Sequence, residues 1–171
     1  MLNYLLTGPP RCGKTTIIKE IIQRLGKSAR GFYTEEIRRG NMRVGFNIRT
    51  LSGQEGILSH VDFKSKYRVG KYRVNLDTMD KIGSKEIELA LAQNKIIIID
   101  EIGKMELFSA RFKDLVWKAL DAENPFIGTI IFVKHPFGDK VKKRKDVKIV
   151  DVSKKSRTEV VDTIIKDLKV V

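Results

Sequence analysis

Close to its start the chain carries the eight residues Gly8-Pro9-Pro10-Arg11-Cys12-Gly13-Lys14-Thr15. They fit the pattern G-x-x-x-x-G-K-[ST], the Walker A motif, in which glycines let backbone N–H groups wrap a phosphate. The lysine of this pattern reaches the β- and γ-phosphates of a nucleotide, and the hydroxyl of its last residue ligates Mg²⁺. We therefore expect this loop to bind nucleotide phosphates, with Lys14 in a catalytic role and Thr15 as a metal ligand.

The residues on either side of the loop have the patterns of a strand and of a helix. Residues 2–6 form a short apolar run. Residues 14–25 place their apolar side chains on one helical face, which comprises Ile17, Ile18, Ile21, Ile22 and Leu25. A phosphate-binding loop requires a strand before it and a helix after it, so this context favours such a loop over an ordinary glycine turn.

The rest of the chain continues the alternation of strand and helix patterns. Residues 31–34 and 44–51 flank the turn Arg39-Gly40-Asn41 and predict a β-hairpin, which a short run at 56–58 extends. Helices are expected at 84–92, 112–120 and from 156 onward, and strands at 95–100, 127–133 and 147–152. Strands that alternate with helices predict a mostly parallel sheet covered on both faces. We therefore expect a single domain over residues 1–171, an α/β fold of three layers (α/β/α) with an antiparallel β-hairpin addition at about 31–60.

Two acidic residues, Asp100 and Glu101, follow the apolar run at 96–99. Open α/β sheets bind ligands at the carboxyl ends of their buried parallel strands, so we expect Asp100 to hold Mg²⁺. A second carboxylate beside a metal ligand can orient and polarise an attacking water, and we expect Glu101 to be catalytic in this way. The alternative for Glu101 is a cap of the next turn or an ion pair with a surface lysine.

The composition fits a globular protein with an anionic partner. The formal net charge is +13, an excess that favours a nucleotide, a nucleic acid or an acidic surface without choosing among them. Residues 134–148 have no clear pattern and contain seven Lys or Arg, so they would form a lid, a nucleic-acid patch or a solvated connection. Abundant Lys and Ile, with little Gln and Cys, are typical of thermophile proteins.

The sequence also indicates where the protein resides. A single cysteine excludes a disulfide framework, and no apolar run approaches the roughly 18 residues that a membrane-spanning helix needs. The N-terminal residues lack the basic start of a signal peptide. We therefore expect a cytoplasmic protein, a monomer without a membrane partner.

Five further stretches, together with the Walker A motif, carry a resemblance to a known family. They are 31–38 (GFYTEEIR), 45–46 (GF), 50–53 (TLSG), 69–72 (VGKY) and, most diagnostic, 98–107 (IIDEIGKMEL). Over essentially its whole length the chain resembles the P-loop nucleoside-triphosphatases of the archaeal and thermophilic-bacterial type, which include the vertebrate cancer-related nucleoside-triphosphatase. It departs from their pattern near its end, where Lys155-Ser156-Arg157 replaces a more Asn-rich approach to the family's arginine and leaves a role for Arg157 open.

The resemblance implies a P-loop NTPase fold with a RecA-like sheet. It also implies an enzyme that hydrolyses the terminal phosphoanhydride of ATP, GTP, CTP and UTP, with Mg²⁺, to the diphosphate and phosphate. It carries the nucleotide site onto the Walker A residues Gly8, Pro9, Pro10, Arg11, Cys12, Gly13, Lys14 and Thr15. The second part of the site would be the Walker B run Ile97, Ile98, Ile99, Asp100, Glu101, Ile102, Gly103 and Lys104.

Two other functions stay open, a nucleotide or small-molecule kinase and an ATPase that acts on nucleic acid. Arg68, Lys71 and Arg73 either supply a cation to the transition state, as an arginine finger does, or form a solvated basic loop. Glu35 and Glu36 either approach the metal or simply flank the hairpin. A kinase needs a second substrate pocket and shields its phosphoryl group from water, whereas Glu101 beside Asp100 favours hydrolysis.

Overall fold

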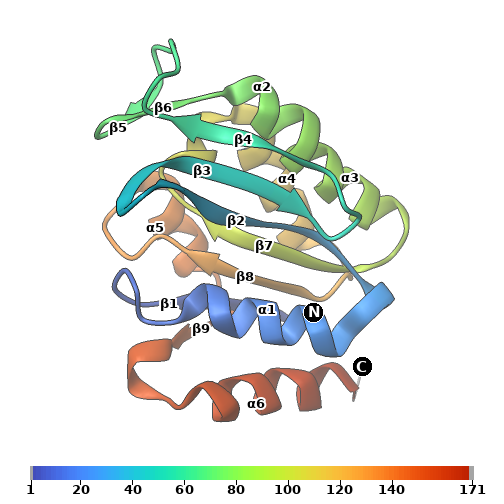
Figure 1. The fold of residues 1–171 in the computed structure, drawn as a ribbon. Helices are drawn as coiled ribbons and strands as arrows, with labels where there is room; N and C mark the ends of the chain where they lie inside the picture. The colour runs from blue at the N-terminus through green and yellow to red at the C-terminus, as the bar shows by residue number, and fades with distance from the viewer. Residues whose placement is uncertain (1, 170–171) are drawn as a thin grey trace.

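In the computed structural model, which describes residues 2–169, the chain folds around one mixed β-sheet (Figure 1). The described residues contain nine strands, β1 (Asn3–Thr7), β2 (Ala29–Arg39), β3 (Met42–Thr50), β4 (Glu55–His60), β5 (Arg68–Val69), β6 (Tyr72–Val74), β7 (Ile96–Ile102), β8 (Phe126–Ile130) and β9 (Val147–Asp151). Their order across the sheet is β5-β6-β4-β3-β2-β7-β8-β1-β9. Strands β2, β7, β8, β1 and β9 run parallel, and β3 to β6 continue the sheet in antiparallel fashion.

Helices cover both faces of the sheet. They are α1 (Lys14–Leu25), α2 (Leu76–Thr78), α3 (Lys85–Ala92), α4 (Ala110–Asp121), α5 (Pro136–Lys142) and α6 (Arg157–Lys169), and a π-helical segment (Met79–Ser84) joins α2 to α3. Figure 1 shows α1 and α6 side by side on one face, and α2, α3, α4 and α5 behind the sheet. Within residues 2–169, none of the helices is long and apolar enough to cross a membrane.

The side chains of the parallel strands divide between two cores because successive residues of a strand point to opposite faces. Leu6 of β1 and Ile98 of β7 pack in the core under α1 and α6. Their neighbours Leu5, Ile97 and Ile99 pack in the core under α3, α4 and α5. The three-layer α/β/α fold expected from the sequence is thereby confirmed. Strand β8 lies between β1, which leads into the Walker A loop, and β7, which leads to Asp100, in the expected RecA-like arrangement.

Strand β2 joins the parallel and antiparallel parts of the sheet. Its residues 29–33 pair in parallel with β7, and its residues 32–39 pair in antiparallel fashion with β3. The expected β-hairpin is present, but its first strand is also a member of the parallel sheet. The addition also extends beyond residue 60, because β6 pairs with β4 and β5 pairs with β6. These strands have only two and three residues, too short to give a sequence pattern.

The strand expected at 127–133 is shorter than its apolar run. It is β8, which ends at Ile130. Phe132 and Val133 continue beyond the end of the sheet and are 53% and 49% exposed. An apolar run alone does not distinguish residues that enter a core from residues that line an open cavity.

Two helical segments were not expected from the sequence. Residues 134–148 contain α5, whose first turn is capped by His135, since its Nδ1 accepts the N–H of Phe137 at 3.2 Å. The helix expected at 84–92 is preceded by α2 and the π-helical segment, so helical structure begins at Leu76. The Asn75 side chain caps this start by accepting the N–H of Thr78.

Gly31 is the residue at which β2 passes closest to β7, and its replacement tests this packing. Its φ is +142°, and a Cβ there would lie 1.8 Å from the carbonyl oxygen of Ile98. We expect Gly31→Ala to lower the free energy of unfolding by about 3 kcal/mol, because backbone has to move. In the hairpin turn, Gly40 has φ +62° and open space around it, so Gly40→Ala should cost only about 1 kcal/mol. Urea denaturation measures both losses, and equal losses would contradict the close approach.

Candidate functional site

The loop of residues 8–13 joins the end of β1 to the start of α1. Gly13, the last residue before the helix, has φ +95°, and Arg11 has φ +62°. The ammonium of Lys14 folds back over the loop and donates hydrogen bonds to the carbonyl oxygens of Gly8 at 2.8 Å and Pro9 at 3.1 Å. The first turn of α1 contains no acidic residue, so its N–H groups and partial positive charge stay available to an anion.

Asp100 is buried near the carboxyl end of β7. Its Oδ1 accepts a hydrogen bond from the Thr129 hydroxyl of β8 at 2.6 Å. Burial raises the pKa of Asp100, while the Thr129 and Thr15 hydroxyls and the Lys14 ammonium lower it. Its other oxygen, Oδ2, is buried without a hydrogen-bond partner among the described residues. An unpaired buried carboxylate oxygen is costly unless a cation or a cation-bound water satisfies it.

The carboxylate of Glu101 lies over Gly103. A Cβ on Gly103 would lie 2.4 Å from Glu101 Oε1, so any other residue at 103 would displace the Glu101 side chain from this position. Burial raises the pKa of Glu101, the charge of Asp100 raises it further, and Lys14 lowers it. Among the described residues, no Lys or Arg forms an ion pair with Glu101. The surface ion pair considered as its alternative role is therefore not formed.

Glu106 is an acidic residue of the same site to which the sequence analysis gave no role. It is 4% exposed and begins a short 3₁₀ turn (Glu106–Phe108) after β7. Burial first, and then the charges of Glu101 and Asp100, raise its pKa to about 8. The only sequence signal was a glutamate five residues after Glu101, and its burial depends on the way this loop folds back.

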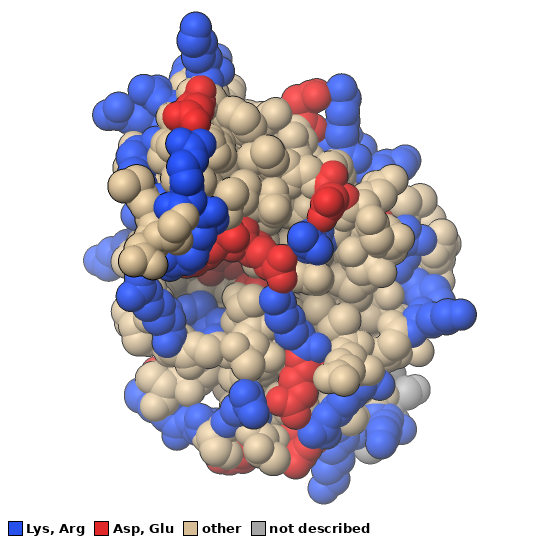
Figure 2. All heavy atoms as spheres, viewed as in Figure 1, with Lys and Arg blue, Asp and Glu red and all other residues tan. Residues whose placement is uncertain are grey.

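These groups line one cavity of about 1050 Å³. The Walker A side contributes Gly8, Pro10, Arg11, Cys12, Gly13, Lys14 and Thr15, and the β7 side contributes Asp100, Glu101, Lys104, Met105 and Glu106. Figure 2 shows acidic side chains in a hollow of this face of the molecule, with Lys and Arg beside them. The structure therefore brings together the four residues expected to act on phosphate, metal and water, Lys14, Thr15, Asp100 and Glu101.

Several other expected site residues do not line the cavity. Ile97, Ile98, Ile99 and Ile102 are fully buried in the two cores, because the strand that carries Asp100 has to be covered on both faces. Gly103 lies beneath Glu101, and Pro9 contributes its carbonyl oxygen to Lys14. The Walker B run thus reaches the cavity through Asp100, Glu101 and Lys104.

The charged residues of the addition divide into two groups. Glu35 and Glu36 line the cavity and are ion-paired, Glu35 with Lys19 at 2.6 Å and Glu36 with Arg43 at 2.9 Å. Arg68, Lys71 and Arg73 do not line it, although their neighbours in the β5–β6 turn do. No residue of 134–148 lines it either.

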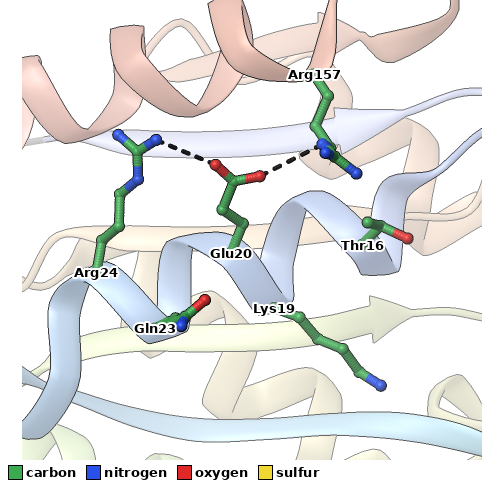
Figure 3. A pocket seen from close by; sticks show the side chains of 6 residues that line it. All are labelled: Thr16, Lys19, Glu20, Gln23, Arg24 and Arg157. Carbon is green, nitrogen blue, oxygen red and sulfur yellow. Dashed lines mark hydrogen bonds and ion pairs between the residues drawn. The ribbon is translucent and has the colours of Figure 1, made fainter.

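A second, shallower depression adjoins the cavity on the outer side of α1 (Figure 3). It has a volume of about 670 Å³ and is lined by Thr16, Lys19, Glu20, Gln23, Arg24 and Arg157. Glu20 is ion-paired with Arg24 at 3.1 Å and with Arg157 at 3.4 Å. Thr16 and Lys19 line both hollows, so this second depression, which we call the shelf, begins where the Walker A loop ends.

Comparison with known proteins gives one consistent family. The model of the NTPase family matches residues 3–165. The chain is 47% identical over 168 residues to nucleoside-triphosphatase THEP1 of Thermotoga maritima, covering 98% of this chain and 96% of that one. The crystal structure of THEP1 from Aquifex aeolicus superposes with a TM-score of 0.86 at 37% identity and 96% coverage of each chain. The solution structure of a human cancer-related nucleoside triphosphatase gives 0.82 at 35% identity, over 98% of this chain and 97% of that one.

The raised pKa of Glu106 predicts a pH-dependent stability. Between its ordinary pKa of 4.5 and about 8, the folded chain keeps a proton on Glu106 that the unfolded chain has lost. The stability that this proton gives is complete below pH 4.5 and is lost as pH rises through 8. We expect wild-type stability to fall relative to Glu106→Gln by up to roughly 1.4 kcal/mol per pH unit in this window. Denaturation from pH 5 to 9 measures this, with Glu123→Gln on an exposed turn as control; parallel wild-type and Glu106→Gln curves would contradict it.

Proposed function

The chain belongs to the NTPase family and is a nucleoside-triphosphate hydrolase, and we propose that it releases the terminal phosphate of ATP, GTP, CTP and UTP in a reaction that depends on Mg²⁺. The proposal rests on one observation above all, the convergence of Lys14, Asp100 and Glu101 on a single cavity. The proposal includes a cytoplasmic, monomeric enzyme whose residues 1–171 act as one catalytic domain, as the sequence analysis expects.

Residues of the Walker A loop would hold the phosphates. Backbone N–H groups of the loop and of the first turn of α1 supply hydrogen bonds and partial positive charge. Lys14 now donates to two loop carbonyls, and its ammonium is within reach of the β- and γ-phosphates once they enter the loop. This arrangement would recognise the triphosphate and would make no contact that distinguishes one base from another.

Thr15 and Asp100 would hold Mg²⁺. The fit is supported by the buried, unpartnered Oδ2 of Asp100, which a cation-bound water would satisfy. When bound, Mg²⁺ neutralises charge that develops on the phosphate oxygens during transfer. Among the described residues, no group of three or more His, Cys, Asp or Glu offers a metal cage, which suits an ion held jointly by protein and phosphates.

Glu101 would act as the general base. It follows Asp100 directly, its carboxylate has no ion pair, and its raised pKa favours acceptance of a proton from water. The attacking water would lie between this carboxylate and the terminal phosphate. Glu106 stands behind Glu101 and keeps its own proton near neutral pH, so the pair carries one negative charge rather than two.

The shelf beside α1 supports the proposal that nucleotides with different bases are hydrolysed. The α-phosphate lies at the Thr15 end of a Walker A loop, and this is where the shelf begins. Its side chains are polar, and all but Glu20 are exposed, so it offers neither an aromatic face nor a buried hydrogen-bonding group to distinguish one base from another.

The two alternative functions have unequal support. Residues 134–148 include α5, which packs through Gly138 and Val141, and they do not line the cavity, so they make no link between the nucleotide site and a nucleic acid. The kinase alternative has one feature in its favour, since the cavity continues past Glu101 to a wall built by the antiparallel addition.

Replacing Glu101 separates binding from hydrolysis. Glu101→Gln keeps the size of the side chain but removes the charge that accepts the proton, so kcat should fall by ~10²–10⁴-fold. Nucleotide affinity should persist, because the loop, Lys14 and Asp100 are untouched. Single-turnover phosphate release and nucleotide Kd measure the two effects, with Glu123→Gln as the control and Lys14→Ala expected to lose both. Unchanged release by Glu101→Gln would rule out this residue as the base.

Substrate range and metal dependence form the second test. With Mg²⁺, ATP, GTP, CTP and UTP should be hydrolysed at rates within about two orders of magnitude of one another, since the phosphates supply the recognition. Excess EDTA should abolish hydrolysis, and added Mg²⁺ should restore it. A phosphate-release assay measures all of these rates. Strict use of one nucleotide, or hydrolysis undiminished by EDTA, would contradict the proposal.

A further inference from the structure

The cavity is larger than a triphosphate and its water require, and its far wall belongs to the antiparallel addition. Terminal phosphates of Walker A nucleotides lie at the end of the loop where Lys14, Asp100 and Glu101 meet. Beyond that point the cavity continues to a wall lined by Arg43 and Phe46 of β3, Leu58 of β4, and Val69, Gly70 and Tyr72 of the β5–β6 turn. A nucleotide in the Walker A loop with its base over the shelf would have this wall on the side of its terminal phosphate.

Three of these residues form a preassembled aromatic corner. The rings of Phe46 and Tyr72 meet edge to face with centroids 5.4 Å apart. The guanidinium of Arg43 lies 5.0 Å from the Phe46 centroid and 5.4 Å from the Tyr72 centroid, and its Nε donates to the Tyr72 hydroxyl at 2.8 Å. Such contacts fix the side chains before any ligand binds. Because Phe46 is only partly buried and lines the cavity, its ring has surface left for a planar group to stack on.

The charged side chains beside this corner indicate which groups a ligand bound there would carry. Glu36 lies opposite Phe46 in the pairing of β2 with β3, and ion pairs with Arg43 and Arg38 keep its pKa below the ordinary range. Glu35 points to the other face of the sheet, toward α1, where it pairs with Lys19 and Arg49. Ionised carboxylates accept hydrogen bonds from hydroxyl groups, as acidic residues do from ribose in dinucleotide sites. Because Arg43 and Arg38 balance the charge of Glu36, its carboxylate offers a hydrogen-bond acceptor to a hydroxyl group without a net charge that would require an ionic ligand.

We propose that this wall is a second ligand subsite, in which the corner of Arg43, Phe46 and Tyr72 binds the planar ring of a neutral, hydroxyl-bearing molecule. Nucleosides have this chemistry. The ligand would stand between the antiparallel addition and the terminal phosphate, so that one cavity holds two molecules. The inference rests on the proposed function only in taking the nucleotide to occupy the Walker A loop.

Isothermal titration of adenosine into the loaded enzyme tests the subsite. The wild-type protein is first saturated with Mg²⁺ and the β,γ-imido analogue of ATP, which occupies the loop and the shelf without being hydrolysed. Adenosine should then bind with 1:1 stoichiometry, and Phe46→Leu should weaken it at least tenfold, because stacking of a base on an aromatic ring is lost. Phe46→Tyr keeps the ring and should retain binding.

A matched control uses a similar cluster on the other side of the molecule. Trp117 of α4 stacks with Phe137 at 6.1 Å and with Arg144 at 4.9 Å, away from the cavity, so Trp117→Leu should leave adenosine binding unchanged. Val69→Trp places a bulky side chain at the same wall and should abolish adenosine binding. This variant tests the subsite independently if Phe46→Leu does not fold. Thermal unfolding of each variant establishes that it is folded.

Each outcome decides between the subsite and its alternatives. No binding of adenosine or uridine to the loaded wild type, or equal binding by Phe46→Leu, would overturn the subsite. Binding of a twelve-residue oligouridine RNA in preference to the nucleosides would overturn it in favour of a nucleic-acid groove. Phosphate release is measured on a portion of the same protein without the analogue, so an active hydrolase that binds no nucleoside refutes the subsite alone, and an inactive one refutes the proposed function.

Discussion

A buried carboxylate at the end of a central strand is the constraint around which this protein is arranged. Burial raises the pKa of Asp100, and the groups that lower it again come from separate parts of the chain, Thr129 from β8 and Thr15 and Lys14 from the start of α1. These groups meet only if β8 lies beside β7 and if β1 lies beside β8, which is the observed strand order. The electrostatics of one side chain and the topology of the sheet therefore depend on each other.

The three carboxyl groups of the cavity also constrain what can bind there. The charge of Asp100 raises the pKa of Glu101, the charges of both raise the pKa of Glu106, and Lys14 lowers the pKa values of Asp100 and Glu101. A triphosphate entering alone would add several negative charges beside them in a poorly solvated place, which is unfavourable. Neutralisation by a cation would remove this conflict, so a triphosphate suits the cavity better together with a divalent ion than alone. The proton that Glu106 holds near neutral pH also reduces the negative charge of the cavity.

Local patterns made part of this structure predictable. The Walker A loop and the helix after it were predicted with the observed bounds, because glycine positions and a 3.6-residue apolar period are local properties. The hairpin, the β7 strand and its acidic pair were also predicted, but with other bounds, since β2 begins at Ala29 and β7 continues past Glu101 to Ile102. By contrast, β5 and β6 exist only through pairing with β4, and Phe132 and Val133 look like core residues although the sheet ends before them. Glu106 could not be assigned for the same reason, since its burial depends on the fold of the loop after β7.

The parallel and antiparallel parts of the sheet contribute different parts of the cavity. The groups proposed to bind phosphate lie on α1 and at the ends of the parallel strands. The wall opposite them is made by the antiparallel strands that β2 joins to that sheet. Since β2 is continuous through both parts, and Lys19 of α1 is paired with Glu35 of β2, the wall is held at a fixed distance from the loop. The shelf on the base side is open and polar, so selective recognition of anything beyond phosphate has to come from this wall. The proposed indifference to the base thus goes together with a structured surface, on the side of the terminal phosphate, that hydrolysis by water alone does not need.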